Sequence, residues 1–464
     1  MVEERKADLM GKEDGGAVEV APIRPSPRVL LQGLASGGLL LLFTMLMLVR
    51  VEPFASWYYA FAWWTFIGLM DAVVLWRRGD SLFWRDHRGF LFLALLSVPA
   101  WLVFEGFNLF IRNWYYVGAS PSWPLRWMGY AICFSTVLPA IFEAMELLGA
   151  TGIVGDLRLK PLGISRRLLA GMVAMGIVSC LLPILFPRYC FPLVWLALFF
   201  LLDPINYLLG EESLLGQWER GEWSTTSRLL LGGLLCGLAW ELFNAEALCK
   251  WIYTVPFFEE GKLFEMPLPG FLGFLPFALE CFAIWNFAKA VARRTTSKAK
   301  GIGLVLCLVA ASLAMFHLVD KNTVGSFKPY VKDLEELAPY EARLLEQAGI
   351  KRLDIWLLKP GARARESLVL ELLGATPEMI AKWRTWAALV TLKGIGTENL
   401  KLLLRAGVTS LRDLAQQEPE SLFRKLQELQ RGAPSPREEQ VRLWVKEARK
   451  VCKEEPGRGL PGCK

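Results

Sequence analysis

The chain contains few residues of the kinds that hold metals and redox cofactors. Only two of its 464 residues are histidine, His87 in a polar loop and His317 near the end of an apolar run. Haem ligation by paired histidines within a helical bundle is therefore not available. No two cysteines have C-x-x-C spacing, and there is no Walker loop, glycine-rich dinucleotide fingerprint or H-E-x-x-H motif. The sequence has no signature of an ATPase, a protease or a redox enzyme, and it names no cofactor.

Charged residues are also scarce, at 21% of the chain, whereas 54% is hydrophobic and the mean hydropathy is +0.34. Apolar runs close to the length of about 20 residues that crosses a bilayer recur along the chain. They predict an all-α polytopic membrane protein. Its nine predicted transmembrane helices lie at residues 30–50, 56–76, 89–112, 126–149, 167–188, 190–209, 227–248, 269–292 and 301–319. The first run follows a polar tail, residues 1–28, and is too long for a signal-peptide core, so we expect it to be retained.

Lys and Arg gather in alternate loops, starting with the amino-terminal tail. The loops on that side contain Arg77, Arg78, Arg85, Arg88, Arg158, Lys160, Arg166, Arg167, Lys289, Arg293, Arg294, Lys298 and Lys300. The positive-inside rule therefore predicts a cytoplasmic amino terminus, and we expect the protein in a cytoplasmic membrane. Nine crossings then place the residues after Asp320 outside the cytoplasm, and one helix more or fewer reverses that side. An extracytoplasmic location would allow Cys452 and Cys463 to form a disulfide.

A repeated polar pattern is the most specific feature of the apolar region. The segment "FEGFN" at 104–108 corresponds to "WELFN" at 240–244, and further pairs follow at nearly constant offset. The matched pairs are Asp71 and Asp203, Glu105 and Glu241, Asn108 and Asn244, Trp114 and Trp251, Tyr116 and Tyr253, Pro139 and Pro276, and Glu143 and Glu280. We interpret residues 29–149 and 150–293 as two parallel four-helix units from a tandem duplication, followed by a ninth helix at 294–320.

Position along each predicted helix separates these residues into two groups. At 1.5 Å per residue, Glu105 and Asn108 fall near the outer surface, next to Trp114 and Tyr116, which suit the aromatic belt of that interface. Asp71 and Glu143 fall near the inner surface by the same estimate. The second unit predicts the same two groups, with Asp203 and Glu280 inside.

Two prolines lie close to the inner carboxylates. Because a proline within a helix lacks an N–H and clashes with the carbonyl four residues back, Pro139 and Pro276 predict a kink in the helices that carry Glu143 and Glu280. A bent helix beside a buried carboxylate makes a pocket plausible.

Two interpretations of the duplicated carboxylates stay open. Ionisable groups within membrane spans are expensive to bury, which favours a functional site. They can equally pair with loop arginines and hold the bundle together. The W-x-Y arrangement followed by Pro and Glu resembles the membrane-bound lycopene cyclases, whose duplicated units carry W-x-Y and a Pro-Glu-Glu element; here the second glutamate is absent and the spacing differs.

The residues after 320 have a different pattern, in which short amphipathic helices alternate with glycine-containing turns. The segment "LKGIGTENLKLLLRAGV" is similar to a helix-hairpin-helix unit, and residues 321–430 resemble an uncharacterised bacterial family of tandem helix-hairpin-helix domains. In DNA-binding relatives a turn like that at Gly394 and Gly396 leaves amide donors free to hold a phosphate. Residues 431–464 are expected to form a linker, one short basic helix and a tail.

The charge of this region gives little support to nucleic-acid binding. Residues 321–464 contain 26 Lys and Arg against 19 Asp and Glu, and Glu398 follows the turn where a phosphate clamp would prefer a cation. We expect protein docking or self-association instead, through an apolar face that includes Leu402, Leu403, Leu404 and Val408.

The sequence therefore predicts a non-enzymatic membrane subunit or scaffold that holds a lipid or another apolar ligand and docks a protein through its carboxyl-terminal domain. One alternative is a membrane enzyme that uses the paired carboxylates on a lipid or isoprenoid. Transport is the second alternative, disfavoured because transporters of this kind gather their site near the midplane of the bilayer.

Overall fold

A computed structural model describes residues 25–257, 261–334, 336–354, 367, 374–429 and 436–454. The first 24 residues, part of the carboxyl-terminal domain and Cys463 lie outside the described residues, so predictions about them are not tested. Cys452 itself is disulfide-bonded.

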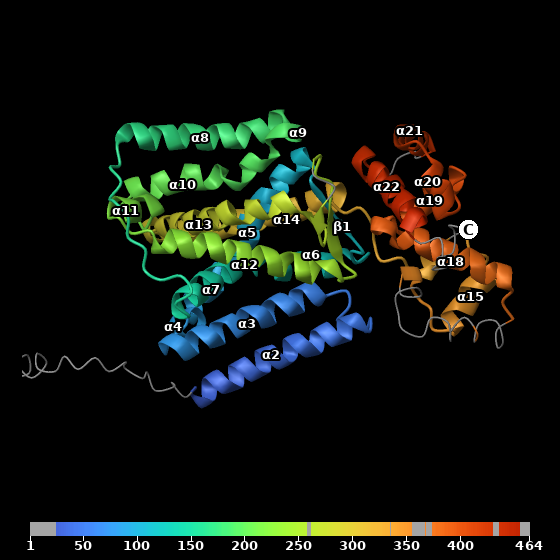
Figure 1. Ribbon diagram of the computed structural model, residues 1–464, viewed down its shortest axis with the longest axis horizontal. Helices are drawn as coiled ribbons and strands as arrows, with labels where there is room; N and C mark the ends of the chain where they lie inside the picture. Colours follow the sequence, from blue (N-terminus) through green and yellow to red (C-terminus); the bar gives the residue numbers. More distant parts are fainter. Residues whose placement is uncertain are drawn as a thin grey trace, which may run out of the picture.

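Nine apolar segments among the described residues are long enough to cross a membrane, which confirms the predicted all-α polytopic class (Figure 1). They are α2 (Pro27–Leu48), α3 (Tyr58–Arg78), α5 (His87–Ile111), α6 with α7 (Trp123–Phe134, Val137–Ala150), α8 (Arg166–Leu185), α9 with η1 and α10 (Pro187–Cys190, Phe191–Trp195, Ala197–Leu208), α12 (Ser224–Ala245), η2 with α13 (Leu268–Gly273, Phe274–Arg294) and α14 (Lys298–Asn322). Two short helices, α4 (Leu82–Arg85) and α11 (Leu214–Glu219), follow α3 and α10.

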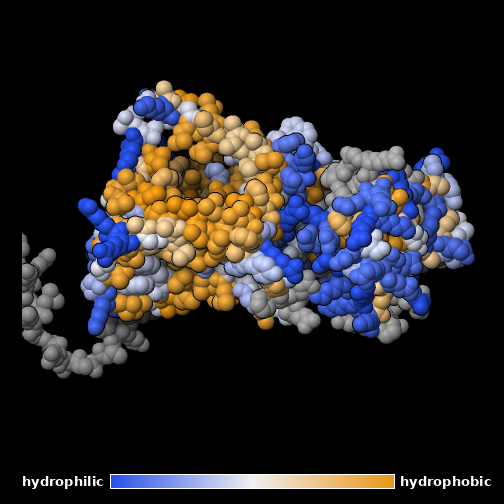
Figure 2. Space-filling view, turned by 90° about the horizontal axis from the view of Figure 1, so that it is seen from above, coloured by the Kyte–Doolittle hydropathy of each residue, from blue (hydrophilic) through white to orange (hydrophobic). Residues whose placement is uncertain are grey.

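The membrane helices lie side by side, and α2 begins at the end of the bundle opposite the carboxyl-terminal domain (Figure 1). An apolar band covers the middle of the bundle between two polar ends, as a membrane protein requires (Figure 2). Helix α12 packs against α7 and α13, whereas α2 and α14 are mostly exposed at the periphery. A Cβ atom at Gly233 of α12 would lie 2.3 Å from the carbonyl oxygen of Phe274, so glycine permits this close helix contact.

The structure adds a β-ribbon that the sequence analysis did not predict. Strand β1 (Trp114–Val117) pairs antiparallel with β2 (Lys250–Tyr253), so that Trp114 lies opposite Tyr253 and Tyr116 opposite Trp251. A second, shorter ribbon joins β3 (Lys262–Leu263) to β4 (Met266–Pro267). The chain after α14 adds to the first ribbon, because the Tyr116 amide donates to the Thr323 carbonyl at 2.8 Å. The first ribbon therefore links the segments that follow α5 and α12 to the start of the carboxyl-terminal domain.

Each of the two prolines lies in the first turn of a helix, just after an interruption of its membrane span, between α6 and α7 for Pro139 and between η2 and α13 for Pro276. Helix α6 ends at Phe134, α7 starts at Val137, and Pro139 is the third residue of α7; Pro276 is likewise the third residue of α13. A proline in the first turn costs no hydrogen bond, because that N–H would have no helical partner. At the α6–α7 break the Ser97 hydroxyl donates to the Phe134 carbonyl at 2.5 Å and accepts from the Leu138 amide at 3.0 Å.

The carboxyl-terminal domain is a separate helical core. Its described helices are η3 (Val331–Asp333), α15 (Pro339–Gln347), α18 (Pro377–Thr391), η4 (Leu392–Gly394), α19 (Gly396–Arg405), α20 (Leu411–Gln416), α21 (Pro419–Leu429) and α22 (Glu438–Glu454). Trp383 and Trp444 are fully buried at its centre. Helix α22, expected as a short helix after a linker, packs against α20 and α21 and forms part of this core.

An aromatic cavity between the two membrane units

Glu105 of α5 lies at the centre of the outer polar cluster. Its Oε1 accepts hydrogen bonds from the indole of Trp101 at 3.1 Å, the indole of Trp114 at 3.0 Å and the hydroxyl of Tyr116 at 2.5 Å. Burial, followed by the neighbouring Glu105, raises the pKa of Tyr116 well above its usual range, so this phenol stays protonated and donates. The predicted grouping of Glu105 with Trp114 and Tyr116 is present, and Trp101 joins it from one helical turn away.

Asn108 and Asn244 hold the two strands of the ribbon in the same way. The Asn108 side chain donates to the Trp114 carbonyl at 3.0 Å and accepts from the Trp114 amide at 3.3 Å. Asn244 makes the corresponding two bonds with Trp251, both at 3.0 Å. Both asparagines are fully buried. Each therefore satisfies the backbone of a strand residue that would otherwise be unpaired near the membrane surface.

The corresponding cluster around Glu241 contains fewer hydrogen bonds. Oε1 of Glu241 accepts from the Tyr253 hydroxyl at 2.8 Å. Trp251 lies near Glu241, but its indole N–H makes no hydrogen bond of normal geometry within the described residues. The position that corresponds to Trp101 is Gly237, where a Cβ atom would already lie 2.4 Å from the Phe274 ring. Glu105 thus has three donors and Glu241 one.

A cavity of about 290 Å³ lies next to the ribbon and is lined by residues from both the 29–149 and the 150–293 segments. Its described lining includes the ribbon residues Trp114, Tyr116, Trp251 and Tyr253. Aromatic side chains of the surrounding helices complete it: Tyr59, Trp101, Tyr130, Phe134, Trp195, Trp240, Phe274 and Phe277. The volume is near the lower end of the range of about 300–1,000 Å³ that is common for small-molecule sites, and such sites are mostly apolar with a few polar groups.

Three buried polar atoms in this lining lack a partner within the described residues. Asn113 is 5% exposed and its Oδ1 has no donor; Trp251 is 8% exposed and its Nε1 has no acceptor; the hydroxyl of Tyr59 has no partner either. Buried polar atoms normally have a hydrogen-bond partner, because an unpaired one costs about 1–3 kcal/mol. The cavity therefore offers an acceptor, a donor and a hydroxyl group that can act as either to a bound molecule.

The inner aspartates hold the short helices that follow them. Oδ1 of Asp71 accepts from the Phe83 amide at the start of α4 at 3.1 Å. In the second unit, Asp203 accepts from the Leu214 and Leu215 amides at the start of α11, both at 2.9 Å. Free amides at a helix start are a favourable site for a carboxylate, so both aspartates have an evident structural role.

Glu143 and Glu280 differ from each other, and only Glu143 lies with its aspartate as predicted. Asp71 is close enough to Glu143 to interact with it electrostatically. Glu280 instead accepts from the Leu198 amide at 2.8 Å, at the start of α10, apart from Asp203. Neither oxygen of Glu143, which is fully buried, has a hydrogen-bond partner within the described residues. The backbone explains this difference. Helix α10 begins at Ala197, so the Leu198 amide in its first turn is free to bond to Glu280, whereas α3 is continuous and leaves no free amide for Glu143.

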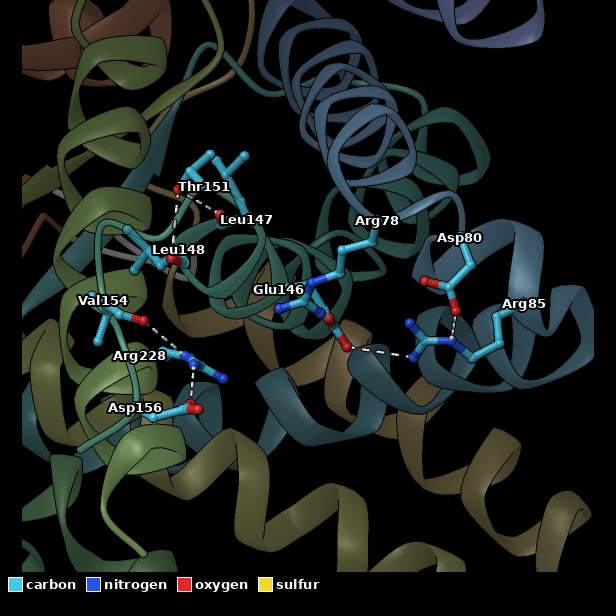
Figure 3. Close-up of polar contacts among 10 residues, drawn as sticks. All are labelled: Arg78, Asp80, Arg85, Glu146, Leu147, Leu148, Thr151, Val154, Asp156 and Arg228. Atoms are coloured by element: carbon cyan, nitrogen blue, oxygen red, sulfur yellow. Dashed lines mark hydrogen bonds and ion pairs between the residues drawn. The ribbon is translucent and has the colours of Figure 1, made fainter. Parts of the chain in front are cut away.

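Loop arginines at the same end do pair with carboxylates, but with Glu146 and Asp156 rather than with the duplicated residues (Figure 3). Glu146 lies between Arg78, at a short contact, and Arg85, at 3.5 Å. Arg228 of α12 lies 3.0 Å from Asp156. The Glu146 pairs join segments within residues 29–149, and the Arg228–Asp156 pair joins segments within residues 150–293.

The glycine turn of the carboxyl-terminal domain faces the ribbon. A Cβ atom at Gly394 would lie 2.1 Å from the Val117 side chain, and one at Gly396 would lie 2.4 Å from Cβ of Ser326. The Tyr115 hydroxyl donates to the Lys393 carbonyl at 2.9 Å. Because side chains alternate along a strand, Tyr115 and Val117 contact this domain while Trp114 and Tyr116 line the cavity. The turn that could hold a phosphate is thus packed against the chain's own membrane part.

A buried ion-pair cluster strengthens the same contact. Glu265, which is 6% exposed, lies 3.1 Å from Lys250 of β2 and 2.8 Å from Lys393 of the glycine turn. Burial alone would raise the pKa of Glu265, but the two ammonium groups hold it at about 2. Arg352 of the carboxyl-terminal domain also pairs with Glu52, in the segment between α2 and α3.

The apolar face expected to dock a protein is inside the domain, which corrects that expectation. Leu403 is fully buried, and Leu402 and Val408 are 7% and 1% exposed. They pack in the common core of the domain, because the helical period turns them toward α18 and α21.

Comparison with known families identifies the carboxyl-terminal part alone. Residues 335–451 match the model of a domain of unknown function (DUF4332). No curated protein and no solved structure shows a significant match to the chain. The match extends over α22, in agreement with the packing of that helix in the domain core.

Proposed function

We propose that the chain is an integral membrane subunit, built from two duplicated units, that holds a lipid or another apolar ligand in the cavity between them. The cavity beneath the β1–β2 ribbon carries this proposal, because both units contribute aromatic residues to one mostly apolar space. The matching bonds of Asn108 and Asn244 support the duplication, since equivalent residues make equivalent contacts across the ribbon.

The carboxyl-terminal domain, whose helix-hairpin-helix character remains our assignment, covers the ribbon from outside the membrane and docks a protein partner or a second copy. Its Gly394–Gly396 turn is occupied by Val117 and Ser326, which disfavours phosphate recognition by that turn. In this proposal the domain lies outside the cytoplasm, and the disulfide of Cys452 is compatible with an oxidising compartment.

Sidedness can be tested with two introduced cysteines at opposite ends of the bundle. Lys321 is exposed at the end of α14. The cysteine of Lys321→Cys should react with a membrane-impermeant thiol reagent in intact cells whose outer membrane or wall, if present, has been made permeable. Arg77→Cys, at the end of α3, should react only after lysis. The reverse pattern would contradict the proposed orientation.

A membrane enzyme that acts on a lipid or isoprenoid is the alternative, followed by a transporter. One observation favours an enzyme. Glu105 and Glu241 each accept from a cavity-lining tyrosine through Oε1, whereas their Oε2 atoms have no partner within the described residues. The enzyme predicted from the sequence would use the paired inner carboxylates. However, the described lining of the cavity does not include Asp71, Glu143, Asp203 or Glu280.

A density map of the purified protein in lipid nanodiscs tests the proposal. We expect ordered ligand density under the ribbon, next to Trp101 and Trp240. A cavity that contains only water or that has collapsed would contradict the proposal.

A further inference from the structure

The described lining of the cavity is polar at one end only. The polar residues come from segments beside the ribbon: the starts of α3 and α6, strand β2, and the chain after α14. Three of them are the cations Arg126, Lys250 and Lys328, and none of the described lining residues is a carboxylate. Deeper residues from the helices, such as Phe134 and Phe277, are apolar. A molecule that matches this lining has a polar head, an apolar body and no positive charge.

Two of the three cations already have close anionic partners. Arg126 forms a two-point pair with Asp320, with Nε–Oδ1 and Nη2–Oδ2 distances of 2.6 Å each. Lys250 lies 3.1 Å from Glu265 and also donates to the Ala245 carbonyl. These two side chains are therefore largely satisfied without a ligand.

Lys328 is the exception. Its ammonium lies 3.9 Å from Oε1 of Glu52 and makes no hydrogen bond within the described residues. That same oxygen already accepts from the Ser56 hydroxyl at 2.6 Å and from Arg352. The Lys328 side chain is only 12% exposed, and burial lowers its pKa. A second anion at this position would compensate a desolvated cation that the protein leaves under-paired.

We propose that the cavity binds an amphiphile with an anionic carboxylate or phosphate head, which lies against Lys328 while its chain lies among the aromatic residues. The unpaired indole N–H of Trp251 supplies a second donor in the same lining. This inference rests on the proposed function, because it specifies the chemical class of the ligand in the same cavity.

Three probes that share one chain length but differ in their head group distinguish binding of the head from binding of the chain. They are palmitate, hexadecyl phosphate and hexadecanol. Each is titrated into the purified full-length protein in neutral nanodiscs, and the bound mass is read by native mass spectrometry. We expect at least one anionic probe to bind about 10-fold more tightly than hexadecanol, a difference of about 1.4 kcal/mol. Which anionic probe binds more tightly then identifies the head as carboxylate or phosphate.

Variants of Lys328 test the head contact. Lys328→Gln should lose the preference for the anionic probes but keep hexadecanol binding, and Lys328→Arg should keep the preference. Lys321→Gln, at an exposed lysine that does not line the cavity, is the matched control and should behave as wild type. Equal binding of all three probes by the wild type would contradict the proposed preference for an anionic head group, but not the proposal that the cavity holds an apolar ligand. Binding of none of them would overturn the proposed function itself.

Discussion

The side-chain amides of Asn108 and Asn244 each bind both the N–H and the C=O of one tryptophan, Trp114 in the first strand and Trp251 in the second. The two tryptophans occupy equivalent places in an antiparallel ribbon, because each lies opposite the tyrosine of the other unit. Each asparagine thus fixes one half of the cavity roof.

This shared pair of bonds predicts a substantial cost of removal at both positions, with Asn108 at least as costly because it also accepts from the Asn113 amide at 2.9 Å. Asn108→Ala and Asn244→Ala should each destabilise the protein by about 1–3 kcal/mol, because buried backbone groups of Trp114 and Trp251 lose their partners. Thermal unfolding in detergent measures the effect. Asn322→Ala is the control and should change stability by less than about 0.5 kcal/mol, since that exposed side chain bonds only to the Leu318 carbonyl within its own helix. A loss at one of the two buried asparagines alone would contradict their equivalence.

Alanine variants of two glycines in the carboxyl-terminal domain distinguish the loss of docking from the effect of backbone strain. Gly394 and Gly407 both have left-handed φ values, +68° and +82°, so substitution by Ala costs each about 1–2 kcal/mol. A Cβ atom would collide with Val117 at Gly394 but meets nothing within 4 Å at Gly407. Hydrogen exchange of residues 114–117 should therefore be faster in Gly394→Ala and unchanged in Gly407→Ala. Equal exchange in both variants would contradict docking of the turn on the ribbon.

The Glu265 cluster predicts a pH dependence of the same contact. The pKa of Glu265 is lowered from 4.5 to about 2 in the folded protein. Its contribution is therefore fully present above pH 4.5 and is lost as the pH falls toward 2. Between pH 6 and pH 3, the protection of the β2 amides, taken as the exchange rate relative to the intrinsic rate at each pH, should fall more in the wild type than in Glu265→Gln, which cannot titrate. Parallel pH profiles for the two proteins would show that the cluster does not hold the domain.

The unequal surroundings of Glu143 and Glu280 predict unequal effects of the same substitution. Glu280→Leu leaves the partly buried Leu198 amide without its acceptor and should cost about 1–3 kcal/mol. Glu143→Leu removes no hydrogen bond and should be neutral or stabilising. Thermal unfolding of both variants decides this. A large loss of folded protein for Glu143→Leu would indicate a structural role that its contacts do not reveal.

Hydropathy was sufficient to predict the nine spans, because chain length and apolar composition decide which segments cross a bilayer. The repeat predicted that Glu105, Trp114 and Tyr116 would meet. It could not predict the ribbon, since strands of four residues carry no periodic signal and pair across more than a hundred residues. The capping roles of Asp203 and Glu280 depend on where α11 and α10 begin, which hydropathy does not determine.

The cavity was also beyond the reach of sequence. Trp101, Trp195 and Trp240 line it, but each lies in an ordinary apolar run, where tryptophan is most often packing or interfacial. The role of Lys328 could not be predicted from sequence. It depends on Glu52 already accepting hydrogen bonds from Ser56 and Arg352, two side chains that lie far apart in the chain. The repeat alone could have suggested a site at the boundary of the two units.

Filling the cavity is the most direct test of a bound apolar ligand. Gly129 of α6 lines the cavity, and a Cβ atom there would meet only the Trp57 ring, at 3.9 Å, so Gly129→Leu should fold and project into the space. Gly303→Leu in α14, where a Cβ atom meets nothing within 4 Å, is the matched helical control. Lipids that co-purify with each protein are extracted and quantified by mass spectrometry against protein. The account predicts that one tightly held species is present in the wild type and Gly303→Leu and lost in Gly129→Leu. The same lipid content in all three proteins would contradict it.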